Sequence, residues 1–165
     1  MEWLLFFEKG IWFGFAALGF AILFNVPPRT LLVIWLLAAV GGLTKLMILQ
    51  IGTGVILASL TGATVIGVLS IPAAHNKHAP PLVFAIPAVI PMIPGMLAYR
   101  MVLGLIKLAD DPNITSYTQV LSETVNNGLK VLFVLMSLAV GVATPMLITR
   151  TSSIKEIKIK KMKLN

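Results

Sequence analysis

The sequence contains no cysteine and few charged residues. Without cysteine, a disulfide framework, a thiolate nucleophile and a cysteine metal site are excluded. Charged residues make up only 12% of the chain, which excludes a soluble domain with an ordinary charged surface. Phosphate-binding glycine loops, His-Glu-x-x-His and nucleophile elbows are also missing. We therefore expect no enzyme, no cofactor and no metal site.

What the sequence does contain is mostly apolar. Hydrophobic residues make up 58% of the 165 residues, and the mean hydropathy is +0.95. A membrane-spanning helix needs roughly 20 apolar residues. The sequence therefore predicts an all-α integral membrane protein, with one transmembrane domain over residues 1–150. About five transmembrane helices are expected, at residues 10–26, 31–50, 52–74, 82–109 and 129–149, with a start near 117 as the alternative for the last.

The net charge of +7 gathers near the C-terminal end of the chain. Five of the thirteen cations lie among the last eleven residues, at Lys155, Lys158, Lys160, Lys161 and Lys163. A basic cluster after the last apolar stretch is typical of a cytoplasmic tail, here residues 151–165, and no nucleic-acid partner is expected. If five spans alternate, Arg29, Lys77 and Arg150 lie on the same cytoplasmic side, and the N-terminus lies outside.

The fourth apolar stretch contains three prolines at membrane depth. Pro87, Pro91 and Pro94 each remove a backbone donor and clash with the carbonyl four residues earlier, so this span is predicted to break. The carbonyls of Val83, Pro87 and Ile90 would then need polar partners, since lipid supplies none. Discontinuous helices of this kind form the substrate sites of many secondary transporters.

Arg100 follows the break by little more than one helical turn. The positive end of a helix resuming at Gly95 and the guanidinium could together bind a substrate carboxylate. Alternatively, Arg100 pairs with an acidic residue or extends to the membrane interface. The candidate substrate-binding residues are Pro87, Pro91, Pro94, Gly95, Tyr99 and Arg100, together with Asn25 and Lys45.

Four further features each allow two interpretations. Lys45, late in the second span, extends to the membrane interface or faces the same cavity as Arg100. Asn25 caps a helix end or contacts a ligand. The histidines around Lys77 belong to a solvated loop rather than a metal site. In the third span, small residues at four-residue spacing pack within this chain or against a second subunit, a homo-oligomer included.

Several motifs resemble the threonine/serine exporter family, specifically the small subunit corresponding to the C-terminal half of the full-length exporters. The resemblance covers most of the chain. One departure is Lys45, which stands where relatives tend to have a histidine- or arginine-containing stretch. The motifs are Phe24-Asn25-Val26-Pro27 to Arg29, Val83-Phe84 to Pro87, Ile90-Pro91-Met92-Ile93-Pro94-Gly95, Ala98-Tyr99-Arg100, Asn127-Gly128 and Pro145.

The resemblance implies a subunit of a secondary exporter in a prokaryotic cytoplasmic membrane. Such a subunit works beside a larger membrane partner of the same family and exports threonine and serine or, in similar split systems, dicarboxylates such as succinate. Both substrate types carry a carboxylate, which agrees with a site at Arg100 near the middle of the membrane. The competing hypotheses are a scaffold that only stabilises its partner and a passive channel.

Overall fold

The computed structural model describes residues 2–110 and 117–149, so Arg150 and the expected basic tail lie outside it. The described residues are almost entirely helical, with no strand among them. The elements are α1 (Glu2–Leu23), η1 (Pro28–Thr30), α2 (Leu31–Gln50), α3 (Val55–Lys77), α4 (Pro81–Val89), η2 (Ile90–Met92), α5 (Gly95–Asp110) and α6 (Tyr117–Thr149), where η marks a 3-10 helix.

The helix lengths confirm the expected number of membrane spans. Among the described residues, α1, α2, α3 and α6 are each long and apolar enough to cross a membrane. The segment of α4, η2 and α5 also passes this test as a pair bent by 56°, and it makes a fifth candidate span if the pair is counted as one span. The prediction of about five spans, with the fourth broken at its prolines, is therefore confirmed.

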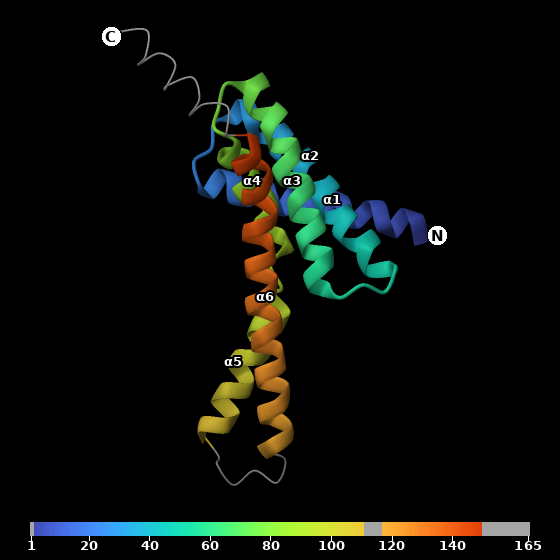
Figure 1. The fold of residues 1–165 in the computed structure, drawn as a ribbon, viewed down its shortest axis with the longest axis vertical. Helices are drawn as coiled ribbons and strands as arrows, with labels where there is room; N and C mark the ends of the chain where they lie inside the picture. The colour runs from blue at the N-terminus through green and yellow to red at the C-terminus, as the bar shows by residue number, and fades with distance from the viewer. Residues whose placement is uncertain (1, 111–116, 150–165) are drawn as a thin grey trace, which may run out of the picture.

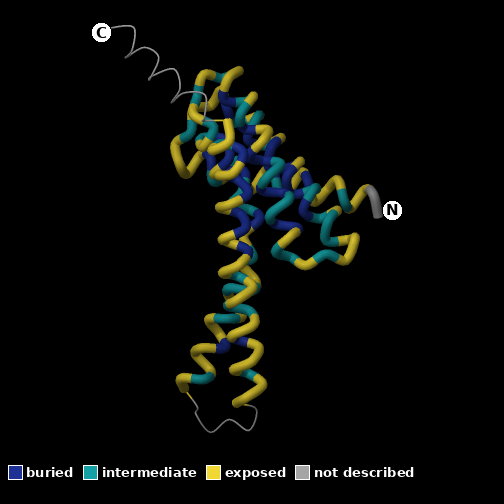
Figure 2. Tube along the Cα trace, viewed as in Figure 1, coloured by how far each residue is buried: buried dark blue, intermediate teal, exposed yellow. Residues whose placement is uncertain are grey.

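The helices form a bundle from which a two-helix hairpin extends. In the bundle, α3 packs against α2 and α6, while α1 and α4 pack against α2. Figure 1 shows α1 running crosswise to α6, and α5 extending away from the bundle beside the first half of α6. Figure 2 shows most buried residues in the bundle. The largest fully buried side chains there include Phe84, Ile34, Ile66, Met92 and Val134.

The small-residue face of α3 is covered within this chain. Gly67 approaches α6 so closely that a Cβ added to it would lie 3.0 Å from the carbonyl oxygen of Val142. A Cβ added to Gly62 would lie 2.7 Å from the carbonyl oxygen of Gly41 on α2. Ala58, Ser59, Gly62, Ala63 and Gly67 are all buried. Packing within the chain is therefore the correct interpretation, and this face is not free for a second subunit.

Several helix boundaries differ from the expected ones. Pro87 does not break the fourth span: it is buried inside α4, and the chain leaves the helix only at Ile93, whose φ of −63° and ψ of 133° are extended. At the end of α3, the helix continues through residues 75–77 and ends at His78, which has a φ of 51°. By contrast, the last helix begins at Tyr117, the earlier of the two starts expected for it. Local packing extends these helices past residues that disfavour them.

Candidate functional site

Lys45 is bonded to the backbone of the broken span. Its side chain is only 8% exposed, and its Nζ donates a hydrogen bond of 2.6 Å to the carbonyl oxygen of Met92. The expectation that Lys45 extends to the membrane interface is therefore wrong. Among the described residues, Lys45 is not one of those that line the groove in which Arg100 lies.

The carbonyl that accepts the hydrogen bond from Lys45 is not one of the three that the prolines were predicted to leave unsatisfied. The carbonyl of Ile90 accepts from the amide of Ile93 at 3.0 Å, so the 3-10 turn already satisfies it. The carbonyl of Met92, two residues later, is directed out of the helix by the extended conformation at Ile93. A broken span at membrane depth needs a polar partner for such a group, and a lysine 47 residues away supplies it.

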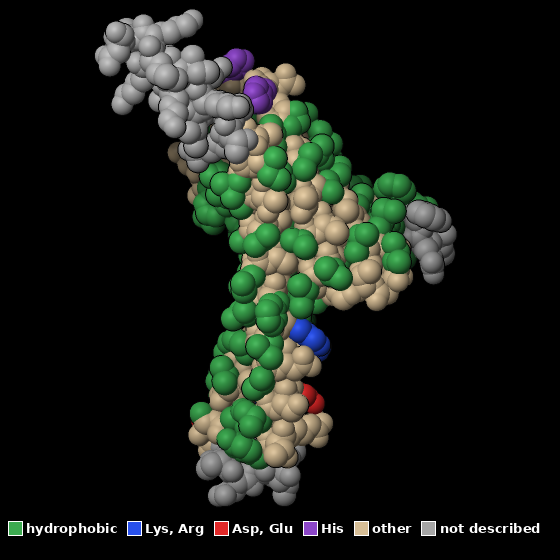
Figure 3. Space-filling model, viewed as in Figure 1, with side chains coloured by type: hydrophobic (Ala, Val, Ile, Leu, Met, Phe, Trp, Pro, Cys, Tyr) green, Lys and Arg blue, Asp and Glu red, His purple; other side chains and the backbone are tan. Residues whose placement is uncertain are grey.

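A groove of about 450 Å³ runs between α5 and the first half of α6. We call it the α5–α6 groove. Its floor is the close contact between Gly104 on α5 and Thr124 on α6. On the face drawn in Figure 3, hydrophobic side chains cover both the bundle and the hairpin, and basic and acidic side chains appear along one edge of the hairpin. The polar residues lining the groove are Arg100, Lys107, Glu123, Thr124, Asn126 and Asn127.

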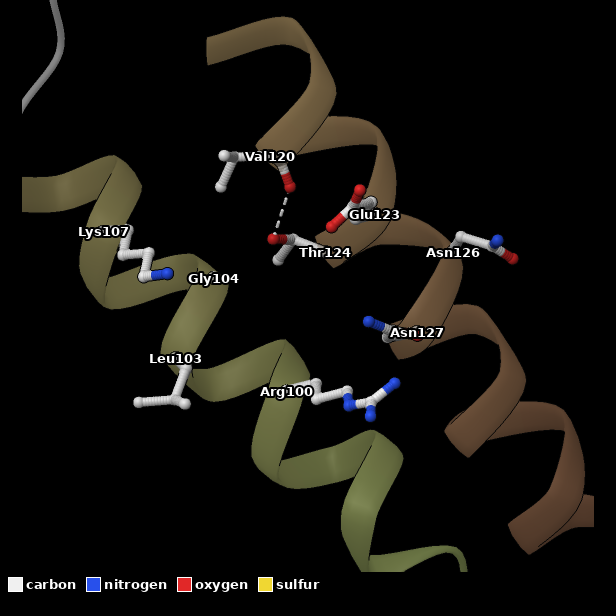
Figure 4. Close-up of a pocket in the computed structure, with 9 residues that line it drawn as sticks. All are labelled: Arg100, Leu103, Gly104, Lys107, Val120, Glu123, Thr124, Asn126 and Asn127. Atoms are coloured by element: carbon white, nitrogen blue, oxygen red, sulfur yellow. Dashed lines mark hydrogen bonds between the residues drawn. The ribbon is translucent and has the colours of Figure 1, made fainter. Parts of the chain in front are cut away.

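Arg100 points across this groove toward α6 (Figure 4), where the amide of Asn127 turns toward it. The Thr124 hydroxyl is occupied locally, since it donates to the carbonyl of Val120 at 2.6 Å. Within the described part of the chain, no ion pair is recorded for Arg100. The groove therefore presents a guanidinium whose donors are free for a carboxylate, with a second cation, Lys107, and one carboxylate, Glu123, along the same walls.

The other candidate residues do not converge on Arg100. Pro91 lines a separate pocket beside Lys9 and Trp12 of α1, and Pro87 lines another beside Phe24. Tyr99 is 61% exposed and does not line the groove, and Gly95 has open space around it. The expected single site at the start of α5 is thus divided between the Lys45 contact at the break and the α5–α6 groove further along α5.

Asn25 ends α1 in the manner of a helix cap. It has a φ of 54°, in the left-handed region that asparagine tolerates. Its amide bonds to the carbonyl of Ile22 at 2.9 Å, and the next amide, that of Val26, bonds to Ala21 at 3.0 Å. These two bonds are the Schellman pattern. The cap interpretation is confirmed, and the side chain is exposed.

The histidines show no metal-site geometry. His75 Nδ1 lies 3.0 Å from the carbonyl oxygen of Ile71, one turn earlier in α3. Among the described residues, no group of three or more histidine, aspartate or glutamate side chains lies close enough to hold a metal ion.

The sequence interpretation missed most of the α5–α6 groove. Glu123, Asn126 and Asn127 were not among the candidate substrate-binding residues, and they lie on α6. A usable signal was present, because Arg100, Gly104 and Lys107 follow one another at four- and three-residue spacing, as do Val120, Thr124 and Asn127. Residues so spaced share one face of a helix.

Comparison with known proteins assigns the chain to a family. The family model described as "Threonine/Serine exporter, ThrE" matches residues 9–148. An uncharacterized protein of Haemophilus influenzae is 33% identical over 130 residues, an alignment that covers 78% of this chain and 42% of that protein. The chain thus spans less than half the length of this relative. No solved structure matches it significantly. Because the family match covers most of the chain, this multi-pass membrane protein belongs to the threonine/serine exporter family.

Proposed function

We propose that this chain is a subunit of a secondary exporter of small carboxylate-bearing metabolites, first of all threonine and serine. The observation that carries the proposal is the guanidinium of Arg100, which faces the α5–α6 groove and has no recorded ion pair within the described residues. A planar guanidinium can hold a carboxylate through two parallel hydrogen bonds. Membership of an exporter family supports transport as the use of that site.

The groove needs further walls to become a transport site. Among the described residues, those that line it all belong to α5 and α6, and the hairpin these helices form extends away from the bundle. An export site must exclude water and lipid on all sides while it is closed. We therefore propose that a larger membrane partner of the same family covers the hairpin. A second copy of this chain is the alternative occupant.

We propose a position for the groove other than the expected site near the middle of the membrane. With 33 residues, α6 is about 50 Å long, which exceeds the roughly 30 Å hydrocarbon core of a bilayer. The polar groove residues lie in its first half, so we propose that the groove opens toward one membrane surface. Arg29 in η1 and Lys77 at the end of α3 support an opposite, cytoplasmic surface, with the N-terminus outside. The proposed location is the cytoplasmic membrane of a prokaryote.

The charges in the groove fit two classes of substrate. Glu123 would meet the ammonium group of an amino acid whose carboxylate is held by Arg100. Lys107, two helical turns from Arg100 on the same face of α5, would meet the second carboxylate of a dicarboxylate such as succinate. Amino-acid export is the leading proposal because the family description names threonine and serine.

The surface that the scaffold hypothesis required is buried within this chain. It relied on the small residues of α3 to hold a partner, and these residues are buried against α2 and α6. A scaffold role would now have to use the hairpin itself. It differs from the transport proposal in one respect, because a scaffold does not need the charge of Arg100.

The proposal is tested by efflux of radiolabelled threonine, serine and succinate from cells expressing this chain, its co-encoded larger partner, or both. Arg100→Gln removes the charge, and Lys130→Gln is the matched control because Lys130 is an exposed cation of α6 outside the groove. We expect efflux to require both chains. Arg100→Gln should raise the half-saturating substrate concentration by about 10- to 100-fold, the effect of losing a hydrogen-bonded charge pair.

Three results would count against this assignment. Equal efflux from Arg100→Gln and Lys130→Gln, with both proteins present in the membrane, would remove Arg100 from the site. Undiminished efflux from the partner alone would leave this chain an accessory role. Flux that persists without any ion gradient would indicate a channel.

A further inference from the structure

At the end of η2, the carbonyl group of Met92 has no helical partner. In an unbroken helix, the carbonyl of Met92 would accept from the amide of Met96. Here Ile93 is extended, and the following amides are directed elsewhere: Gly95 donates to Ile93 at 2.9 Å, while Leu97 and Ala98 both donate to Pro94. The Met92 oxygen instead accepts from Lys45 Nζ at 2.6 Å.

Lys45 makes this contact in an environment that penalises charge. Within the described part of the chain, it is the one charged side chain that is buried, and no ion pair is recorded for it. An ammonium group taken out of water without a counter-ion is costly, so its retention points to a specific role. The contact with Met92 compensates part of this cost, because a carbonyl dipole presents its negative end to the ammonium.

Gly41 of α2 and Gly62 of α3 allow α2, α3 and η2 to approach one another beside the break. A Cβ added to Gly62 of α3 would lie 2.7 Å from the carbonyl oxygen of Gly41, 2.5 Å from Met92 Cε and 3.2 Å from Lys45 Cβ. Lys45 follows Gly41 by four residues and therefore lies on the same face of α2. The lysine is thus held directly beneath the break by the tightest part of the α2–α3 contact.

We infer that Lys45 is a built-in cation of the broken span, a positioning residue that fixes the bend between η2 and α5. Secondary transporters with discontinuous helices hold a coupling cation on unwound backbone carbonyls. In this chain, the ammonium group of Lys45 bonds to such a backbone carbonyl, that of Met92. The 56° bend sets the direction of α5 and therefore the place of Arg100 in the α5–α6 groove. The consequence for transport rests on the proposed function, whereas the consequence for the bend does not.

The bend can be measured directly because the chain contains no cysteine. Spin labels on Val40→Cys in α2 and Leu105→Cys in α5, both exposed positions, report the distance across the break in the full chain in lipid nanodiscs. Leu105 lies about 15 Å along α5 from Gly95, so a 20° change in bend moves it by roughly 5 Å. A second pair, Val40→Cys with Leu57→Cys, reports the α2–α3 contact alone.

Three substitutions separate charge from donor capacity. Lys45→Met removes both, Lys45→Gln keeps a donor without the charge, and Lys45→Arg keeps both. Thr44→Val is the matched control, since the Thr44 hydroxyl only bonds to Val40 on its own helix. We expect Lys45→Met and Lys45→Gln to shift or broaden the Val40–Leu105 distance by several ångströms while the Val40–Leu57 distance stays constant. Lys45→Arg and Thr44→Val should retain the wild-type distance.

Transport is measured on the same variants. Lys45→Met should raise the half-saturating substrate concentration about tenfold or more, with partial recovery in Lys45→Arg. An unchanged Val40–Leu105 distance in Lys45→Met would overturn the inference. A wild-type Val40–Leu105 distance in Lys45→Gln would overturn the role of the charge. This test remains valid even if Lys45→Met does not fold. A shifted distance combined with full transport by Arg100→Gln would support the positioning role of Lys45 while refuting Arg100 as the substrate site.

Discussion

Thr124 on α6 lies directly against Gly104 on α5, at the point where the two helices of the hairpin come closest. A methyl group added to Gly104 would overlap the Thr124 hydroxyl and lie 3.0 Å from its Cβ. The hydroxyl cannot turn away freely, because it donates to Val120 at 2.6 Å and Thr124 is buried. Both residues line the α5–α6 groove, so this contact fixes the distance between its walls.

The first prediction concerns this contact. Gly104→Ala should destabilise the protein by about 1–3 kcal/mol, because overpacking here outweighs the helix propensity that alanine gains. The measurement is thermal unfolding of the detergent-solubilised protein. Gly19→Ala on α1 is the control, since nothing lies within 4 Å of a Cβ added there. If both variants unfold at the same temperature, the close α5–α6 contact does not exist in solution.

The second prediction concerns Gly62 at the α2–α3 contact. Gly62→Ala should cost roughly 1–3 kcal/mol, because the added methyl group meets the fixed carbonyl of Gly41 as well as Met92. Gly54→Ala, in open space before α3, should leave stability almost unchanged. Unfolding is measured on this chain without a partner. A Gly62 variant that is stable alone but fails to co-purify with a partner would contradict the intramolecular packing of this face.

Composition and hydropathy were sufficient to predict the bundle. Each span exceeds the length that a bilayer requires, and the prolines of the fourth apolar stretch gave the break to within a few residues. The position of Pro87 inside α4 could not be predicted, since a proline in a helix costs little when neighbouring helices compensate for it. Helix ends depend on such packing, which one sequence does not reveal.

The two functional features depended on tertiary structure to different degrees. Lys45 was a candidate by its charge alone, but its bond to Met92 joins residues far apart in the sequence and depends on the direction of the bend. The α5–α6 groove could have been anticipated from helical spacing on both walls. It was missed because no residue of α6 was among the candidate substrate-binding residues. Their exposure on α6 is compatible with a helix that extends beyond the hydrocarbon core.

The third prediction concerns Asn25. Its left-handed conformation suits glycine better than asparagine and disfavours alanine, so Asn25→Gly should preserve stability while Asn25→Ala should cost about 1 kcal/mol. Efflux per folded protein should be the same in both variants, because the side chain only ends α1. A loss of transport in the stable glycine variant would instead support the ligand interpretation.

The fourth prediction concerns the hydroxyl group of Ser59. Among the described residues, its Oγ is the one buried side-chain polar atom without a hydrogen-bond partner. Ser59→Ala should therefore leave stability unchanged or raise it by up to about 1 kcal/mol. Ser70→Ala is the matched control on the same helix, where the hydroxyl donates to Gly67 at 2.7 Å, and it should be destabilising. A destabilised Ser59→Ala protein would show that this hydroxyl has a partner in the membrane.

The last prediction separates the two substrate classes of the α5–α6 groove. Glu123→Gln removes the one carboxylate facing the groove, and Lys107→Met removes the second cation while keeping a long apolar chain. If the substrate is an amino acid, its ammonium loses a charged partner in Glu123→Gln, and the half-saturating concentration should rise about tenfold. Lys107→Met should then have little effect on threonine or serine.

A dicarboxylate reverses this pattern, since its second carboxylate loses Lys107 and no longer faces the negative charge of Glu123. Succinate efflux should fall in Lys107→Met and rise or stay constant in Glu123→Gln. Both variants are compared with Lys130→Gln, which leaves the groove intact. Equal responses of all substrates to both variants would place the discriminating contacts on the partner, because a site built from these two walls cannot treat an ammonium and a carboxylate alike.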